Sequence, residues 1–175
     1  MIRYLANIKP PIVPSAEWDK AYASIVDAGS ANNPNRTADM NFTAALAGCV
    51  KVNSSSCYPE NIWSSMVRSS LPTSLSLYDT VEIFAKLAVT MHDALLVLTT
   101  LQYGFWFWRP EMATRAGDAR HEPIPNWTPY LRTPPHPEYP SGTVTSYSAA
   151  VMVCRPNHSF DLGSFVQEYA SYINV

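Results

Sequence analysis

The feature that most constrains the fold is the long stretch from Ser76 to Trp106, which contains no proline and no glycine before Gly104. Apolar residues recur along this stretch at every third or fourth position, the spacing that gathers side chains on one face of an α-helix. Lys86 and Asp93 lie within its most apolar part, where charged groups make a membrane span costly, so a core helix is expected instead. The sequence therefore predicts an all-α bundle in which other helices cover one long central helix.

Prolines mark where the chain leaves this helical pattern. Most of the fifteen prolines lie in Lys9–Pro14 and Pro123–Pro140, and each one removes a backbone donor and disfavours helix before it. We expect an extended arm over Met1–Pro14, a long proline-rich loop over Pro110–Pro140, and a single domain over residues 15–175. Further helices are predicted at Ser15–Ala28, Ala38–Gly48, Thr143–Cys154 and Leu162–Ile173, and a short segment of unassigned structure is expected around Ile62–Arg68.

Composition and the absence of known motifs exclude several classes of function. The formal net charge is only -2 and 15% of residues are charged, so no basic stripe is available for nucleic acid or an anionic membrane surface. The sequence has no zinc-binding cysteine or histidine spacing, no glycine-rich phosphate loop and no G-x-S-x-G element. We therefore expect no nucleic-acid partner, no membrane partner and no metal site.

Glycosylation sequons indicate a secreted protein. Five Asn-x-Ser/Thr triplets occur in the sequence, whereas chance would give roughly two. Asn126 is expected to be the poorest acceptor, because Pro129 follows its sequon at once and the loop around it is expected to be buried. We predict N-linked glycans at Asn35, Asn41, Asn53 and Asn157.

The cysteines and the N-terminus also bear on the compartment. Cys49 and Cys57 flank a short serine-rich loop, a spacing that a disulfide bond can close, and Cys154 is left as a buried thiol in a helix. The alternative to secretion is a Ser/Thr-rich cytosolic surface. No apolar run of a signal peptide follows Arg3, so an exported chain is expected to be a mature or partial sequence.

Two segments carry a resemblance to a known family. Tyr103–Arg115 reads Y-G-F-W-F-W-R-P-E-M-A-T-R, and His136–Gly142 reads H-P-E-Y-P-S-G. Together they resemble the vanadium-dependent haloperoxidases and the type 2 phosphatidic acid phosphatase superfamily, in which a long helix ends in K-Y-x-x-x-x-W-R-P-x-x-A-x-R. A loop of the form W-x-P-x-L-x-T-P-x-H-P-E-Y-P-S-G-H then follows. The resemblance covers about residues 76 to 172 and implies a helical fold around an oxyanion pocket. Between the two segments the matching residues are Trp127, Pro129, Leu131, Thr133 and Pro134.

The pocket that the resemblance implies is only partly present. A buried vanadate or phosphate must be neutralised by fixed cations and by backbone N–H donors. The family uses a lysine, an arginine, a Ser-Gly pair followed by a histidine, and then a second arginine and a last histidine. Arg109 stands at the first arginine, and Ser141 and Gly142 stand for the Ser-Gly pair. Gln102 stands at the lysine position and Thr143 at the position of the acid/base histidine.

The missing groups are expected to abolish anion binding and catalysis. The chain ends at Val175, about where the second arginine and the last histidine would follow, so the domain is expected to be truncated at its C-terminus. Losing a lysine, an arginine and a histidine removes about 5 to 9 kcal/mol of anion binding, at about 1.5 to 3 kcal/mol for each charge-assisted hydrogen bond. Replacing the acid/base histidine lowers the rate by a further factor of about 10² to 10⁴. We therefore expect no intact catalytic residue and no cofactor.

Three hypotheses of function follow from this partial match. The first is a secreted, glycosylated pseudoenzyme that uses the haloperoxidase-like scaffold for structure or self-assembly. As a filament subunit, it would pack the arm Met1–Pro14 on the next copy, although an arm folded back on its own domain is equally compatible with the sequence. The second is an incomplete chain of an active vanadate-dependent haloperoxidase or acid phosphatase, with vanadate as cofactor. The third is a binding module that holds a small ligand in the vestigial pocket.

Other polar residues are given structural roles. His136 lies between two prolines and is expected to order its loop through a hydrogen bond. Asp93 is expected to be buried and to bond to the backbone. The charged run Arg115–Glu122 is expected to be a solvated loop.

Overall fold

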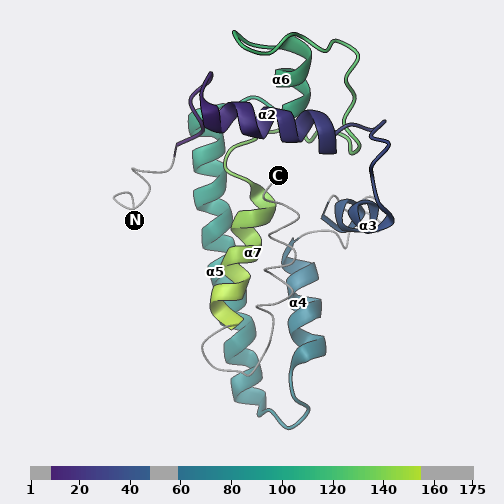
Figure 1. The fold of residues 1–175 in the computed structure, drawn as a ribbon. Coiled ribbons are helices and arrows are strands. Elements are labelled where there is room, and N and C mark those ends of the chain that lie inside the picture. Colours follow the sequence, from purple (N-terminus) through teal and green to yellow (C-terminus); the bar gives the residue numbers. More distant parts are fainter. Residues whose placement is uncertain (1–8, 48–58, 155–175) are drawn as a thin grey trace. The chain divides into compact units, whose positions relative to one another are not determined.

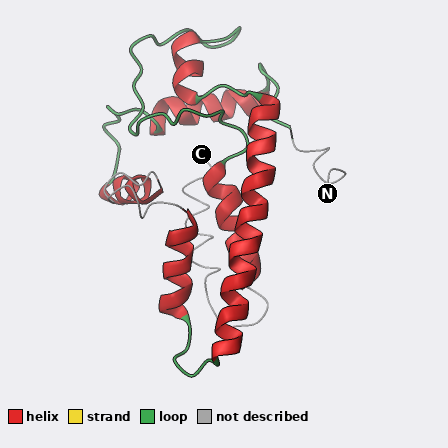
Figure 2. Cartoon of the chain, turned by 180° about the vertical axis from the view of Figure 1, so that it is seen from behind, coloured by secondary structure: helices red, strands yellow, loops and turns green. Residues whose placement is uncertain are grey.

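The computed structural model describes residues 9–47 and 59–154, and its regular elements within these ranges are all helices (Figures 1 and 2). The prediction of an all-α fold is confirmed. Ser30 and Pro129 also form an isolated β-bridge. In chain order the helices are α2 (Ala16–Ala28), α3 (Ala38–Ala47), α4 (Pro59–Ser70), α5 (Leu77–Phe105), α6 (Pro110–Ala116) and α7 (Gly142–Cys154).

The long central helix is present as α5, with 29 residues. The hydroxyl of Ser76 accepts a hydrogen bond from the N–H of Asp79 at 3.1 Å, which satisfies one of the free donors at the start of the helix. Trp106 follows the last turn with a positive φ of 52° and donates its N–H to the carbonyl of Gln102 at 3.0 Å. The helix therefore ends in a left-handed residue, the conformation that satisfies the last carbonyls.

Two shorter helices, α2 and α6, differ in how well their sequence predicts them. The hydroxyl of Ser15 accepts from the N–H of Trp18 at 3.1 Å and caps the start of α2, and Gly29 is the cap residue that follows its end. In contrast, α6 corrects the prediction of an uninterrupted loop over Pro110–Pro140. Pro110 occupies the first turn of α6, where its missing N–H costs nothing because that position has no intrahelical acceptor.

The described residues form two compact units. The first, called the N-terminal unit, consists of residues 9–41 and 100–140. The second, called the bundle unit, consists of residues 42–47, 59–99 and 141–154. Helices α3 and α5 each contribute residues to both units. The single domain over residues 15–175 stays a prediction.

The N-terminal unit packs α2 against α6 around aromatic rings. Trp18 and Tyr22 of α2 are buried together with Ala113 of α6. Val13 of the predicted arm packs against the same cluster, whereas Ile12 is 78% exposed. At least one arm residue therefore lies on its own chain.

The bundle unit packs α4, α5 and α7 side by side, as Figures 1 and 2 both show. Its core holds Trp63 from α4, Leu87 and Met91 from α5, and Tyr147 from α7. The ring of Trp63 meets that of Tyr147 edge-on at a centroid distance of 5.2 Å. The opposite side of α5 carries exposed apolar side chains, which include Tyr78, Val81, Val89 and Leu96.

Among the described helices, none is long and apolar enough to cross a membrane.

Candidate anion site

Arg109, at the first arginine position of the resemblance, lies just before α6 and pairs with a carboxylate. Its Nη1 lies 2.7 Å from Oε2 of Glu138, and its side chain is 18% exposed. Arg109 Nε and Glu138 Oε2 are buried and form no directed hydrogen bond among the described residues, so the contact is an ion pair. Burial raises the pKa of Glu138, and the electrostatic effects of the neighbouring Arg109 and His136 only partly offset that rise. The guanidinium that an oxyanion would use already has an anionic neighbour.

Gln102, at the lysine position, is buried in the last turn of α5. It is 3% exposed, and its Nε2 donates to the carbonyl of Pro140 at 2.9 Å. A neutral amide with a hydrogen-bond partner can be buried at far lower cost than an ammonium group. Position 102 therefore supplies a link between α5 and the end of the proline-rich loop, and it supplies no positive charge.

Helix α7 begins at Gly142, directly after Ser141, as expected for a Ser-Gly pair that opens a helix. The hydroxyl of Ser141 lies 3.4 Å from the N–H of Val144, a long capping contact. The carbonyl of Ser141 accepts from both the N–H and the hydroxyl of Thr145, at 3.0 and 2.8 Å. A Cβ added at Gly142 would lie 3.4 Å from Leu98, which is an ordinary contact.

Thr143, at the position of the acid/base histidine, is half-buried in the first turn of α7. A threonine hydroxyl does not titrate near neutral pH and cannot serve as the general base that histidine provides. The structure places Gln102 and Arg109 in the N-terminal unit, and Ser141, Gly142 and Thr143 in the bundle unit. Within the part of the chain that the structure describes, no three His, Cys, Asp or Glu residues are placed to hold a metal ion.

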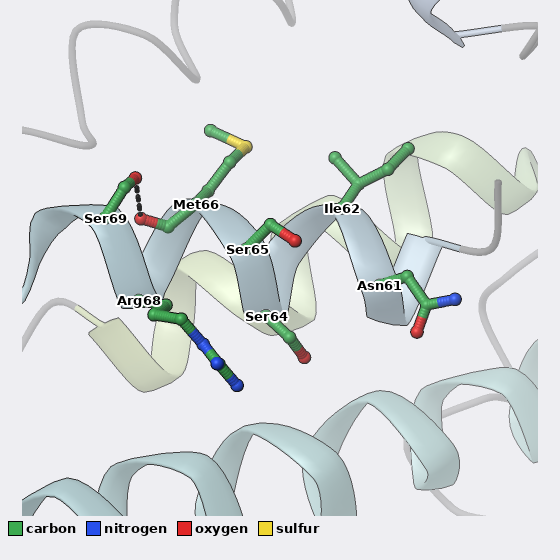
Figure 3. Close-up of a pocket in the computed structure, with 7 residues that line it drawn as sticks. All are labelled: Asn61, Ile62, Ser64, Ser65, Met66, Arg68 and Ser69. Carbon is green, nitrogen blue, oxygen red and sulfur yellow. Dashed lines mark hydrogen bonds between the residues drawn. The ribbon is translucent and has the colours of Figure 1, made fainter. Parts of the chain in front are cut away.

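A shallow hollow on α4 contains none of these residues (Figure 3). Its side chains come from one helix and point to both sides of it, so they do not converge on a ligand. The dashed bond in Figure 3 is local, from the hydroxyl of Ser69 to the carbonyl of Met66 at 2.9 Å. The hollow is lined by Asn61, Ile62, Ser64, Ser65, Met66, Arg68 and Ser69.

The charged run Arg115–Glu122 contains a buried group, so the prediction of a solvated loop is wrong for Asp118. The Asp118 side chain is 7% exposed and accepts from Trp18 Nε1 at 2.6 Å and from the N–H of Arg120 at 2.8 Å. Burial alone would raise the pKa of Asp118, but these hydrogen bonds and the neighbouring His121 outweigh it and lower the pKa. The position of Asp118 directly after Gly117 was the available signal, because aspartate often accepts from backbone N–H groups in turns.

The described sequons differ in their surroundings. Asn35 is exposed in a loop, whereas Asn41 lies inside α3 with its Oδ1 buried and without a partner among the described residues. Asn126 is exposed beside the buried Trp127, so the expectation of a buried site there is wrong. The predicted sites that lie outside the described residues are Asn53, Asn157 and the disulfide pair Cys49 and Cys57.

Two smaller predictions can also be checked. His136 Nδ1 lies 3.0 Å from the carbonyl of Pro137, which confirms a local hydrogen bond in that loop. Asp93 is exposed on α5, so its predicted burial is wrong.

Comparison with known proteins places these residues in a family. No curated protein and no solved structure matches the chain. A family model described as the VCPO second helical-bundle domain, where VCPO denotes vanadium chloroperoxidase, matches residues 82–170, just over half of the chain. The matched range contains Arg109, Ser141 and both motif segments that carry the resemblance. The chain therefore belongs to the family of the VCPO second helical-bundle domain.

Proposed function

We propose that this chain is a pseudoenzyme that keeps the helical scaffold of its family and has given up oxyanion binding. The observation that carries the proposal is Gln102, which is 3% exposed and uses its amide to bind the Pro140 carbonyl where the resemblance calls for a lysine. A lysine contributes a point charge to an oxyanion, and an amide contributes none. The ion pair of Arg109 with Glu138 supports the same reading, because an incoming anion must compete with a carboxylate already 2.7 Å away.

An active enzyme of which this chain is a piece is the second candidate. Arg109, Ser141 and Gly142 favour it, since they match the motif residue by residue. Ligands on another segment or subunit could complete such a site, but they do not account for Gln102 and Thr143, which lie inside the matched range. The internal replacements therefore favour the pseudoenzyme.

Vanadate binding and halogenation by the full chain test the two candidates. With vanadate, peroxide and bromide or chloride supplied, we expect no halogenation above a no-protein control, and no micromolar vanadate binding in equilibrium dialysis. The variant Arg109→Ala is the matched control. Vanadate-dependent halogenation that Arg109→Ala removes would overturn the pseudoenzyme and support the second candidate. The double variant Gln102→Lys, Thr143→His is also expected to bind vanadate weakly, because Arg109 stays paired with the carboxylate of Glu138.

The role proposed for the scaffold is structural, as a self-assembling subunit. The exposed apolar side of α5 within the bundle unit and the exposed Ile12 of the arm support this role, since large exposed apolar patches mark interaction surfaces. Docking of one arm on the next copy gives a ring or an open filament. Light scattering of the full chain and of a chain lacking residues 1–14 tests it: we expect an oligomer that the deletion dissociates. A monomeric full chain, or an oligomer that the deletion leaves unchanged, contradicts it.

Secretion and N-glycosylation are proposed with this role. Asn35 is the best acceptor by its surroundings, because it is exposed in a loop, and Asn126 is exposed as well. The helical position of Asn41 argues against its use, because acceptor sequons belong to surface loops. Glycopeptide mass spectrometry of the secreted chain is expected to find Asn35 occupied and Asn41 bare, and a glycan on Asn41 alone would refute this order.

A further inference from the structure

One side of α5 within the bundle unit carries exposed, large apolar side chains. In Figures 1 and 2, α4 and α7 both lie along the same side of α5, the side that buries Leu87 and Met91. The other side exposes Tyr78 at 77%, Val81 at 58% and Val89 at 62%. At 3.6 residues per turn, these three positions fall within about a quarter of the helix circumference. They form one continuous surface, called the α5 stripe.

The charged side chains of the same helix segment lie along one edge of the α5 stripe, next to Val89. The four charged residues, all exposed, fall within about a sixth of the helix circumference and are Asp79, Glu82, Lys86 and Asp93. Glu82 and Lys86 form an ion pair at 2.5 Å. One lysine beside three carboxylates does not suit an anionic membrane or a nucleic acid, since both require a basic face. A protein surface is therefore the fitting occupant of the stripe.

An identical helix in antiparallel orientation complements the charged edge. A two-fold axis perpendicular to two antiparallel helices brings the same edge of each helix together, whereas a parallel pair brings opposite edges together. With the axis close to Val89, Lys86 of each copy lies beside Asp93 of the other, and this contact occurs twice. A shift of the second copy by one heptad brings Lys86 to Lys86 in one direction and Asp93 to Asp93 in the other. Charge complementarity therefore selects one register.

The same register also pairs small side chains with larger ones. Ala85 of one copy lies opposite Leu96 of the other, and Val89 lies opposite His92. All four residues are exposed on α5, so they are available for such a contact. Facing layers that alternate small and large side chains interdigitate, which lets two helices approach closely.

We propose that the α5 stripe is a two-fold interface, in which α5 of one copy packs antiparallel on α5 of a second copy and Lys86 of each pairs with Asp93 of the other. The inference rests on the self-assembly proposed above and names a contact for it. The contact is isologous, because the same surface serves on both copies, and it closes on itself. Docking of the arm on the next copy is a separate, heterologous contact, so the two together join pairs of chains into a longer assembly.

Self-association of the full chain, measured by sedimentation equilibrium, tests the contact. Val89→Glu brings a carboxylate of each copy close to the two-fold axis, so we expect it to weaken self-association about a hundredfold. Ser65→Glu is the matched control, because it adds the same charge at an exposed position of α4, and it is expected to change nothing. An oligomer that Val89→Glu leaves intact overturns the α5 contact and leaves self-assembly through the arm standing. A full chain that is monomeric at every concentration overturns both.

Charge reversal tests the antiparallel register. Lys86→Asp and Asp93→Lys each bring like charges together between the two copies, and each is expected to weaken self-association about tenfold. The double variant puts opposite charges together again, so we expect its association to return close to that of the parent chain. The ion pair of Lys86 with Glu82 inside one chain stays lost in the double variant, so recovery reports only the contact between copies. Absence of recovery overturns the register.

Unfolding of the monomers distinguishes a second copy from cover by the same chain. At concentrations where both chains are monomeric, Val89→Glu is expected to unfold with the free energy of the parent, because Val89 is 62% exposed. A lower unfolding free energy of the variant would show that another segment of the same chain covers Val89, and it would overturn the proposal.

Discussion

Replacing Gln102 by lysine puts back the family residue and asks whether this chain can still accommodate its charge. The side chain is 3% exposed and its Nε2 donates to the Pro140 carbonyl at 2.9 Å. Loss of that bond leaves the carbonyl unpaired, at a cost of about 1 to 3 kcal/mol, which is the effect expected for Gln102→Met. A buried ammonium without a counter-charge adds to this cost. We therefore expect Gln102→Lys to lower the unfolding free energy by about 3 to 5 kcal/mol.

Urea unfolding followed by far-UV circular dichroism measures both variants against the parent chain. Ala88→Lys is the matched control, because Ala88 is exposed on the same helix and a lysine there is expected to change stability by less than about 0.5 kcal/mol. A Gln102→Lys chain as stable as the parent would show that the site still accommodates a cation. Recovery of stability on adding vanadate would show that the oxyanion pocket is intact. Either result would refute the reasoning behind the pseudoenzyme.

Three further predictions concern stability and are checked by urea unfolding. Gly117 has a φ of 66° and an added Cβ would lie 2.5 Å from a backbone oxygen, so Gly117→Ala should cost about 2 kcal/mol or more. Gly104→Ala, with no neighbour within 4 Å, should stabilise α5 by up to about 1 kcal/mol, and equal effects of the two changes would contradict this. Trp63→Ala should lower the free energy of unfolding by about 3 to 5 kcal/mol, because Trp63 is 1% exposed. Trp106 is 71% exposed, so Trp106→Ala should lower it by less than about 1 kcal/mol. A larger loss for Trp106→Ala would contradict the exposed position of that ring. Hydrogen bonds outweigh burial and lower the pKa of Asp118, so its stabilisation is present at neutral pH and is lost in acid; the parent chain should therefore lose stability in acid more steeply than Asp118→Asn, and parallel profiles would contradict this.

The helices could be predicted where a local signal decides the structure. The span of α5 follows from apolar spacing without prolines, and the start of α2 follows from the cap at Ser15. The failure at α6 has a local cause. Proline density predicts a loop throughout Pro110–Pro140, although proline is well suited to the first turn of a helix, where Pro110 lies.

The hydrogen bonds and ion pairs of the site residues could not be predicted, because they depend on contacts between distant segments. The motif located Arg109, but not its ion pair with Glu138. Asp118 reads as a surface residue in a charged run, and its shortest hydrogen bond comes from Trp18, which lies 100 residues away in the sequence. A polar group can be buried when a distant segment supplies its hydrogen-bond partner, and a single sequence does not identify that partner.

The internal partners give a physical reason why this scaffold can exist without an anion. In an oxyanion pocket the cations depend on the bound anion for their counter-charge, and an empty pocket leaves them repelling one another. In the N-terminal unit of this chain, Arg109 has Glu138, and the Pro140 carbonyl has the amide of Gln102. In the bundle unit, Ser141 turns its hydroxyl to the start of its own helix. Replacing a lysine by glutamine at position 102 removes one repelling charge and keeps a donor for the carbonyl, so the proposed loss of anion binding and the retained fold have the same cause.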